Sequence, residues 1–296
     1  MINQILMNQI ELDRVLSVLP VRPVSSHKGS FGRVLNITGS SRYRGAAVLG
    51  CLGALRAGAG LCVLASVPDA CNAAAAQLPE VILCPLPVCE KGYINFEKAI
   101  PLLKEEMSLA SAVLIGCGLG NDHHAAKLLE FVLGNDKTAI IDADGLNALA
   151  NNLHLLKNTR VQAILTPHPG EMSRLCKAST DDIAKDRAGY AARFAKENNV
   201  TVALKGHGTV VASPDGNLFI NPTGGPGLAK GGSGDVLAGI IASFAAQGIS
   251  PVDACICGVY LHGLSADKTA ARRGQYAMLP GEITVDLAEI LAMHGR

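Results

Sequence analysis

The stretch that decides the fold runs from Asn221 to Leu237 and reads NPTGGPGLAKGGSGDVL. Apolar residues continue after its glycines at helical intervals, so the glycines lead directly into the amino end of a buried helix. Such an end presents unpaired N–H groups and about half a positive charge, and glycines let an anion approach without obstruction by Cβ. We therefore expect an anion hole, made by Gly231, Gly232, Ser233 and Gly234.

Asp235 follows the glycines in the first turn of this helix. As an ordinary helix-end carboxylate it would favour the positive end of the helix by about 0.3–1 kcal/mol. Beside a phosphate site, however, a carboxylate repels the phosphate unless it accepts a proton from a hydroxyl that attacks phosphorus. Both interpretations stay open on the residues alone. The segment is neither a P-loop nor a dinucleotide fingerprint, because the Gly-Lys-Ser/Thr of the first and the third glycine of the second are missing.

Outside this stretch, short β-branched runs alternate with helical periodicity, which predicts an α/β fold whose mostly parallel central sheet is covered by helices on both sides. Strands are expected at residues 33–38, 61–65, 112–116, 139–142, 163–166, 201–205, 209–213 and 218–221. Helices are expected at residues 46–57, 123–133, 146–150, 182–197, 233–246, 251–271 and 284–292. No linker divides the chain, so we expect one domain over residues 1–296. Residues 1–24 form an N-terminal arm, whose apolar residues 1–19 are either an interface element or a packed segment.

Composition narrows the classes of partner. Lys and Arg total 26 against 25 Asp and Glu, and aromatic residues are 4% of the chain, so nucleic acid is not an expected partner. The longest uncharged run, residues 236–252, ends in polar and turn residues, and the chain opens without an apolar secretory core. We expect no membrane partner and a cytoplasmic location. The nine cysteines include no C-x-x-C pair, so buried free thiols are expected, not a disulfide framework or a structural metal.

The sequence GGSGD at residues 231–235, followed by an apolar helix, resembles the G-G-[ST]-G-D anion-hole motif of the ribokinase-like superfamily. Within that superfamily the chain most closely resembles the NAD(P)H-hydrate dehydratases, which use ADP or ATP to reconvert hydrated NADH or NADPH into the working cofactor. Further segments support the resemblance, in the family order from about residue 25 to residue 292: residues 28–32, 43–47, 55–60, 142–147, 165–171 and 204–209.

The resemblance implies a three-layer α/β/α ribokinase-like fold, and it assigns roles to matching positions. Asp235 would be the catalytic base. The adenine nucleotide would be held by Lys205, Gly206, His207, Gly208, Thr209 and Gly234, the last donating its N–H to the transferred phosphate. The substrate side would be formed by Ala46, Gly118 and His168, together with Asp235. From the residues alone, each also fits an ordinary structural role, such as a strand turn, a core alanine or a structural histidine.

Two carboxylates are candidates for a metal. Glu171 and Asp142 lie at neighbouring strand ends and carry the oxygen ligands that Mg²⁺ prefers, so they suit a phosphate-bound Mg²⁺, held directly or through water. Lys230 just precedes the anion hole and is either a phosphate contact or a solvated surface lysine. The chain departs from the family pattern at Cys117, where a proline is usual, but this change removes no charged group.

The implied reaction begins with attack of the 6-hydroxyl of the S epimer of hydrated NADH or NADPH on the terminal phosphorus of ADP, or of ATP. Asp235 takes the hydroxyl proton, and loss of phosphate then restores the dihydronicotinamide. The resemblance implies Mg²⁺ as cofactor, a symmetric homo-oligomer with a tetramer favoured, and a stand-alone dehydratase with a separate NAD(P)H-hydrate epimerase as functional partner. The alternatives are a ribokinase-like kinase of a vitamin alcohol and a non-catalytic nucleotide-binding module. Residues 45–47, 116–120 and 168–171 favour the dehydratase over the kinase.

Overall fold

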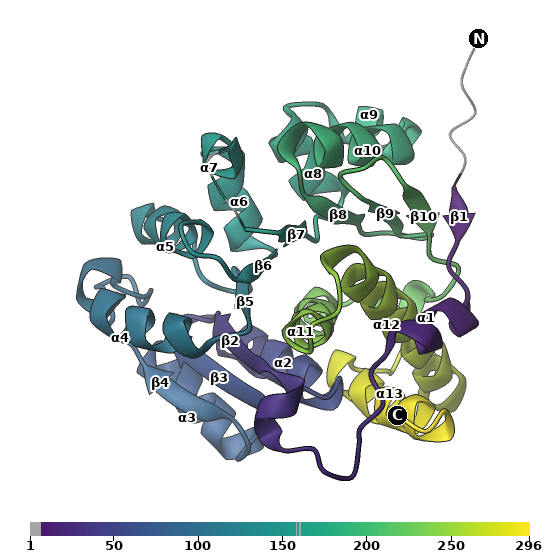
Figure 1. The fold of residues 1–296 in the computed structure, drawn as a ribbon. Coiled ribbons are helices and arrows are strands. Elements are labelled where there is room, and N and C mark those ends of the chain that lie inside the picture. Colours follow the sequence, from purple (N-terminus) through teal and green to yellow (C-terminus); the bar gives the residue numbers. More distant parts are fainter. Residues whose placement is uncertain (1–6, 158, 160) are drawn as a thin grey trace.

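The computed structural model describes residues 7–157, 159 and 161–296, and its strands form one ten-stranded sheet (Figure 1). The strand order is β1-β10-β9-β8-β7-β6-β5-β2-β3-β4. The strands are β1 (Asn8–Gln9), β2 (Arg33–Ile37), β3 (Leu61–Ser66), β4 (Ile82–Pro85), β5 (Ala112–Ile115), β6 (Thr138–Ile141), β7 (Ala163–Leu165), β8 (Thr201–Leu204), β9 (Val210–Ala212) and β10 (Leu218–Ile220). All pairings are parallel except those of β9 with β8 and β10, which confirms the mostly parallel sheet.

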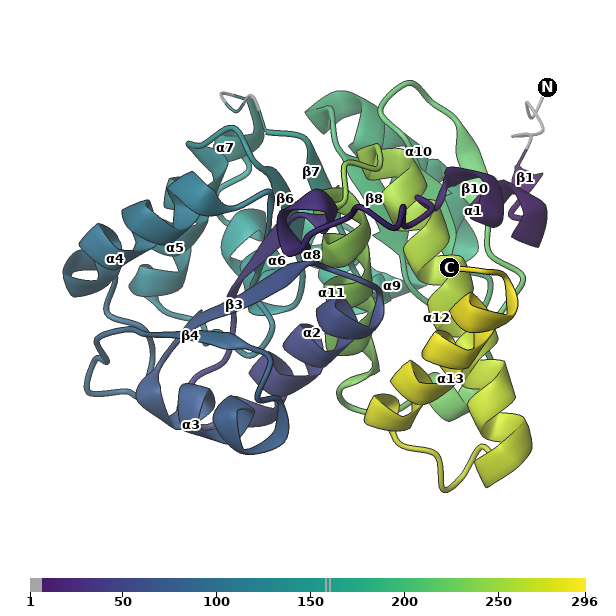
Figure 2. The ribbon, with the colours of Figure 1, turned by 60° about the horizontal axis from the view of Figure 1, so that its bottom comes forward.

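Helices cover both faces of the sheet and make the three expected layers (Figures 1 and 2). One layer holds α1 (Leu12–Val18), α2 (Arg44–Arg56), α3 (Pro68–Gln77), α11 (Ser233–Ala246), α12 (Pro251–Arg273) and α13 (Pro280–Met293). The opposite layer holds α4 (Phe96–Leu109), α5 (His123–Leu133), α6 (Asp144–Ala150), α7 (His154–Lys157), α8 (Pro169–Cys176), α9 (Thr180–Lys185) and α10 (Arg187–Asn198). Two short 3-10 helices, Lys28–Phe31 and Pro226–Leu228, lie between these elements.

Close packing of α2 against α11 fixes the helix that carries Asp235. The strand β5 lies beneath α11, and every residue of this strand is buried, as expected for a parallel strand covered on both faces. A Cβ on Gly53 would lie 2.4 Å from the Val236 carbonyl oxygen, and one on Gly239 would lie 2.1 Å from that of Gly50. Only glycine permits this approach of the two backbones. The amino end of α11 is therefore held rigidly beside the carboxyl ends of the central strands.

The N-terminal arm is part of the fold from residue 8. Asn8 and Gln9 pair with Phe219 and Ile220 of β10, and α1 packs on α12. An ion pair of 3.0 Å between Arg14 and Asp253 fastens the two helices together. The packed-segment interpretation thus holds for this part of the arm, while residues 1–6 lie outside the described residues.

The structure corrects the expected helix at 182–197. Asp186 interrupts it with φ −140° and ψ 57°, and α9 and α10 replace one helix. The Asp186 carboxylate accepts the Gly189 N–H at 2.9 Å, so it begins a new helix where the apolar spacing predicts continuation. Among the α-helices and strands of the described residues, seven have no predicted counterpart: β1, α1, α3, β4, α4, α7 and α8. Within the described part of the chain, every helix is too short or too polar to cross a bilayer.

Candidate active site

Four adjacent strands bring polar side chains to one edge of the sheet. Cys117 follows β5, Asp142 follows β6, Thr166 follows β7 and Lys205 follows β8. The Lys205 Nζ donates to Asp142 Oδ1 at 2.6 Å and lies 3.8 Å from Glu171 Oε2, and the Thr166 hydroxyl donates to the same Asp142 oxygen at 2.8 Å. In open parallel sheets this edge is where ligands bind.

Lys205 is held between two buried carboxylates. Burial alone would lower the pKa of its ammonium group, but the charges of Asp142 and Glu171 more than offset this and raise the pKa. Burial likewise raises the pKa of Glu171, against the opposing effect of Lys205. The structure thus brings together the predicted nucleotide lysine and both predicted metal-site carboxylates, and it shows that the ammonium group already occupies the space between them.

Asp235 faces this cluster from the amino end of α11. Single ligand atoms of Cys117, Asp142 and Asp235 lie within 4.8 Å of one another. Burial raises the pKa of Asp235 to about 6 and the nearby charge of Asp142 adds to this, while the Cys117 thiol and Lys205 act in the opposite direction. No cationic nitrogen of a described side chain lies within 4.0 Å of the Asp235 carboxylate. The site therefore holds a carboxylate that has a pKa of about 6 and, among the described side chains, no cationic partner within 4.0 Å.

Free backbone N–H groups adjoin Asp235. Gly232 precedes the helix with φ 101°, a conformation that favours glycine, and no side chain caps the helix. In the described part of the structure, no acceptor pairs with the N–H of Gly232, Gly234 or Asp235. A Cβ on Gly234 would lie 3.3 Å from Lys205 Nζ. Of the predicted anion hole, Ser233 is the member whose N–H is engaged, because it donates to the Lys230 carbonyl at 3.3 Å.

The predicted nucleotide turn, residues 205–209, joins β8 to β9 beside Lys205. Gly206 and Gly208 have φ 145° and 61°, and the Thr209 hydroxyl donates to the Gly206 carbonyl at 3.1 Å. Arg187 of α10 donates to the carbonyls of His207 and Leu204, at 2.6 and 2.9 Å. The sequence analysis includes Arg187 only as part of the expected helix at 182–197. It holds the turn in place, which no local pattern could have signalled.

The predicted substrate residues Ala46 and Gly118 lie in contact. A Cβ on Gly118, where φ is 60°, would lie 2.9 Å from the Ala46 Cβ, and the Ser40 hydroxyl donates to the Gly118 carbonyl at 2.9 Å. The first turn of α2 and the loop after β5 thus form one continuous wall. Leu49, one turn further along α2, packs against Gly232 of the anion hole, which places this wall beside the hole.

His168 has a structural role, and its contact with the substrate stays a prediction. It caps α8: its Nδ1 accepts the N–H groups of Gly170 and Glu171, at 3.0 and 3.4 Å, and Glu171 Oε2 accepts the His168 N–H at 2.7 Å. Burial lowers the pKa of His168, and the positive charges of Lys205 and Arg174 lower it further. A neutral ring with Nδ1 as acceptor leaves Nε2–H for a ligand or for Glu171 Oε1, which lies 3.4 Å away.

Lys230 is half-buried and bound to backbone carbonyls, so it is not a freely solvated lysine. Its ammonium group donates to the carbonyls of Tyr276 and Met278, at 2.7 Å each. It thereby tethers the segment between α12 and α13 to the residue that precedes the anion hole. Contact of Lys230 with a phosphate stays a prediction.

Polar side chains that the sequence analysis missed anchor the glycine-rich stretch on α12. Asn221 Nδ2 donates to the Val259 carbonyl at 3.0 Å, and the Thr223 hydroxyl donates to that of Tyr260 at 2.9 Å. His262 lies buried in the same helix, and burial together with the charge of Lys205 lowers its pKa to about 4. The available signal was a histidine within the uncharged stretch 254–266 of this helix.

A cavity of about 560 Å³ flanks the predicted substrate side. It is polar and cationic, and its walls come from Asn121, Asn147, Ala150, Asn151, Arg174 and Lys177. Arg174 Nε donates to Asn147 Oδ1 at 2.9 Å, and Asp144 accepts the Gly120 N–H at 2.8 Å. The loop that contains Gly118 is thus hydrogen-bonded to the helix that borders this cavity.

Comparison with known proteins gives consistent matches. Residues 34–288 match a protein family described as NAD(P)H-hydrate dehydratase. The chain is 35% identical over 272 residues to the ADP-dependent (S)-NAD(P)H-hydrate dehydratase of Bacillus subtilis, covering 92% of this chain and 93% of that one. It is 43% identical over 277 residues to a bifunctional NAD(P)H-hydrate repair enzyme of Moorella thermoacetica, covering 93% of this chain. The chain spans only 52% of that relative, and about half of the other bifunctional relatives that it matches.

Solved structures agree with these matches. The ADP/ATP-dependent NAD(P)H-hydrate dehydratase of Bacillus subtilis, co-crystallised with ATP and Mg²⁺, superposes with a TM-score of 0.83 at 29% identity, covering 99% of this chain and 100% of that one. A ribokinase-like superfamily protein of Enterococcus faecalis gives 0.84 at 29% identity, covering 97% and 96%. These matches confirm the predicted three-layer ribokinase-like fold.

Proposed function

This chain belongs to the NAD(P)H-hydrate dehydratase family, and from that premise we propose that it is an ADP-dependent (S)-NAD(P)H-hydrate dehydratase, a hydro-lyase. The observation that carries the proposal is the Asp235 carboxylate. It is partly buried, it has a pKa of about 6, and it adjoins unpaired N–H groups at the amino end of α11. A general base works best when its pKa lies near the working pH, and such a helix end binds phosphate.

In the proposed first step, Asp235 takes the proton of the substrate's 6-hydroxyl while that oxygen forms a bond to the terminal phosphorus of ADP. The bond from phosphorus to the bridging oxygen breaks, and AMP leaves. In the second step the carbon–oxygen bond at C6 breaks with the help of the ring nitrogen lone pair, and phosphate leaves with the electron pair. Loss of a proton from C5 restores the dihydronicotinamide. The sum is dehydration of the substrate coupled to hydrolysis of ADP to AMP and phosphate.

The proposed phosphate position gives a role to the nearby cation, the ammonium group of Lys205. Charge that develops on the phosphoryl oxygens would meet the N–H groups of Gly232 and Gly234 and the ammonium group of Lys205, which lies against Gly234. Donors held in advance stabilise such charge without reorganisation, since folding has already fixed them. Asp142 and Glu171 keep that ammonium group in place and charged.

Mg²⁺ fits this site as an ion carried by the nucleotide. It takes oxygen ligands and keeps several waters, and Asp142 and Glu171 supply carboxylate oxygens. Direct ligation by both would require displacement of the Lys205 ammonium group, which bonds Asp142 at 2.6 Å. We therefore expect these two carboxylates to hold the ion through water. When bound, Mg²⁺ neutralises charge on the phosphates and helps to orient them.

The remaining parts of the proposal concern donor, substrate and partners. The Bacillus subtilis relative is named as ADP-dependent and the solved Bacillus subtilis structure as ADP/ATP-dependent, so the names support ADP as a donor without excluding ATP. The cationic cavity by Arg174 and Lys177 suits the phosphates of hydrated NADH or NADPH. The bifunctional names of longer relatives support a separate NAD(P)H-hydrate epimerase as functional partner.

We propose a homotetramer acting in the cytoplasm, and size-exclusion chromatography with light scattering tests the assembly.

The activity is tested by mixing purified protein with hydrated NADH, Mg²⁺ and either ADP or ATP. We expect the near-ultraviolet absorbance of the dihydronicotinamide ring to return, with AMP and phosphate released in equal amounts from ADP. A vitamin-alcohol kinase would phosphorylate a pyridoxal- or thiazole-type alcohol and leave that absorbance unchanged. A nucleotide-binding module would bind ADP without releasing phosphate. Either result would overturn the proposal.

A further inference from the structure

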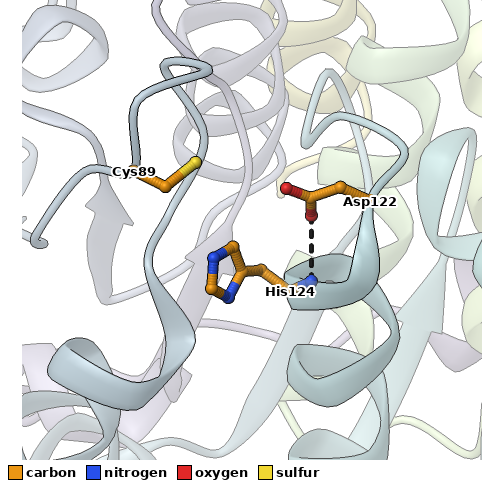
Figure 3. A group of neighbouring side chains, drawn as sticks. All are labelled: Cys89, Asp122 and His124. Atoms are coloured by element: carbon orange, nitrogen blue, oxygen red, sulfur yellow. Dashed lines mark hydrogen bonds between the residues drawn. The ribbon is translucent and has the colours of Figure 1, made fainter.

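A second cluster of metal-ligating side chains lies apart from Asp235, between the loop that follows β4 and the amino end of α5. Figure 3 shows its members, Cys89, Asp122 and His124, pointing toward a common space. One ligand atom of each lies within 4.8 Å of the others. Cys89 is half-buried and His124 is buried, so the cluster lies just beneath the surface.

The two side chains from α5 are fixed before any ligand arrives. Asp122 Oδ1 caps the helix by accepting the N–H groups of His124 and Ala125, at 2.9 and 3.3 Å, which leaves its second oxygen available (Figure 3). His124 Nδ1 lies 3.0 Å from Glu97 Oε2 and also faces the Phe96 backbone N–H at 3.4 Å, so Nε2 is the ring nitrogen left for a metal. A carboxylate beside one ring nitrogen orients the ring, as partners of metal-binding histidines commonly do.

Cys89 is held by the turn that contains it. Its N–H donates to the Tyr93 carbonyl at 2.9 Å, and its own carbonyl accepts the Gly92 N–H at 2.9 Å. The thiol therefore comes from a closed turn with a fixed backbone. Ordering three ligands in advance reduces the conformational entropy that binding must overcome.

We propose that Cys89, Asp122 and His124 bind one Zn²⁺ ion, with a water molecule as the fourth ligand. A sulfur, a nitrogen and an oxygen donor form the mixed set that suits zinc, whereas Mg²⁺ takes oxygen alone. The Cys89 thiol releases its proton to solvent when the sulfur–zinc bond forms. Glu97 positions His124 from outside the ligand set.

The bound ion would join two loops that border the substrate side. The Gly92 carbonyl accepts the Ser41 N–H at 2.9 Å, and the Tyr93 ring packs so closely on Gly120 that a Cβ there would lie 2.5 Å from it. Zinc would thus fasten the Cys89 turn to the loop that continues from Gly118. We infer a structural role that stabilises this wall of the site.

Two other clusters compete for the same metal and must be separated from this one. Glu97, His123 and His124 form a more exposed set, and Cys117, Asp142 and Asp235 form a set within the active site. The first competing cluster contains His123 and the second contains Cys117, and neither residue belongs to the proposed site. His123→Gln and Cys117→Ser are therefore matched controls for the two competitors.

The test uses untagged, metal-free protein titrated with Co²⁺ and then with Zn²⁺. We expect one equivalent of Co²⁺ to give a thiolate-to-metal charge-transfer band, and Zn²⁺ to abolish it by displacement. Zn²⁺ at about 100 times its dissociation constant should raise Tm by about 5 °C. Cys89→Ser should eliminate the band. Asp122→Asn keeps a residue that can cap α5 and should weaken Zn²⁺ binding about 10- to 100-fold, as should Glu97→Gln.

The controls decide the assignment. His123→Gln and Cys117→Ser should keep both the band and the Zn²⁺ affinity. A band that survives Cys89→Ser, or that disappears only in Cys117→Ser, overturns the proposed site. So does wild-type protein that gives no charge-transfer band with stoichiometric Co²⁺. These outcomes are independent of dehydratase activity, because the readout is metal binding alone.

Discussion

Replacement of Asp235 by asparagine should lower the turnover of the enzyme and, at the same time, raise the stability of its folded state. The substitution keeps the shape of the side chain and removes its charge. Removal of a general base typically costs about 10²- to 10⁴-fold in turnover, so we expect a loss in this range with ADP affinity nearly unchanged, because the N–H groups of α11 remain. A kcat close to the wild-type value would refute the catalytic role.

The stability gain follows from the raised pKa of Asp235. Folding raises that pKa from 3.8 to about 6, which corresponds to about 3 kcal/mol against the folded state once the carboxylate is fully ionised. The folded state holds the proton more tightly than the unfolded state. Stability is therefore lost as pH rises from about 4 through about 6, and the cost is constant above that. The asparagine side chain does not ionise and lacks this cost, so Asp235→Asn should be more stable by up to about 3 kcal/mol at pH 8 and by almost nothing near pH 4.

Urea unfolding of both proteins at several pH values measures this difference. Asp181→Asn, an exposed aspartate in α9, is the control and should change the free energy of unfolding by about 0.5 kcal/mol or less. Equal or lower stability of Asp235→Asn at pH 8 would contradict the argument that the carboxylate is held ionised against its surroundings. The wild-type kcat/KM should also fall about tenfold per pH unit below pH 6, because the protonated carboxyl cannot act as a base.

Three further substitutions test the surrounding groups. Gly234→Ala places a methyl 3.3 Å from the Lys205 ammonium group and should weaken ADP binding at least about tenfold by calorimetry, whereas Gly281→Ala, at the same position of α13 with ordinary contacts, should not. Lys205→Met leaves two buried carboxylates without their cation and should lower the free energy of unfolding by about 3–5 kcal/mol in urea. His168→Asn keeps a side chain that can cap α8. If His168 has only this structural role, the variant should have a near-normal KM for hydrated NADH. If His168 contacts the substrate, both His168→Asn and His168→Ala should have a raised KM.

Elements with strong local signals could be predicted to the residue. The helices at 123–133 and 233–246 have the bounds expected from the sequence, since Asp122 caps the first and the glycine run precedes the second. α4 was missed because Pro101 lies inside it, where a proline usually argues against a helix. α3 is short and rich in alanine, so it lacks a clear apolar face.

The candidate site was predictable where its chemistry is local. The glycines and Asp235 are adjacent in sequence, and their order alone indicates a phosphate-binding helix end. The ion pair of Lys205 with Asp142 joins residues 63 apart, and only the parallel pairing of β6, β7 and β8 brings them together. The Cys89 cluster was missed for the same reason, because a search for paired cysteines cannot find a mixed set of ligands from two loops.

The buried thiol beside Asp235 bears on how the protein meets oxidants and inhibitors. Burial raises the pKa of Cys117, with the negative charges of Asp235 and Asp142 adding to the effect, so the sulfur stays protonated and is a poor nucleophile. Peroxide and alkylating drugs should reach the half-buried Cys89 and Cys176 before they reach the buried Cys117. A covalent warhead aimed at Cys117 would therefore fail, although this thiol lies beside Asp142 and Asp235 in the candidate active site.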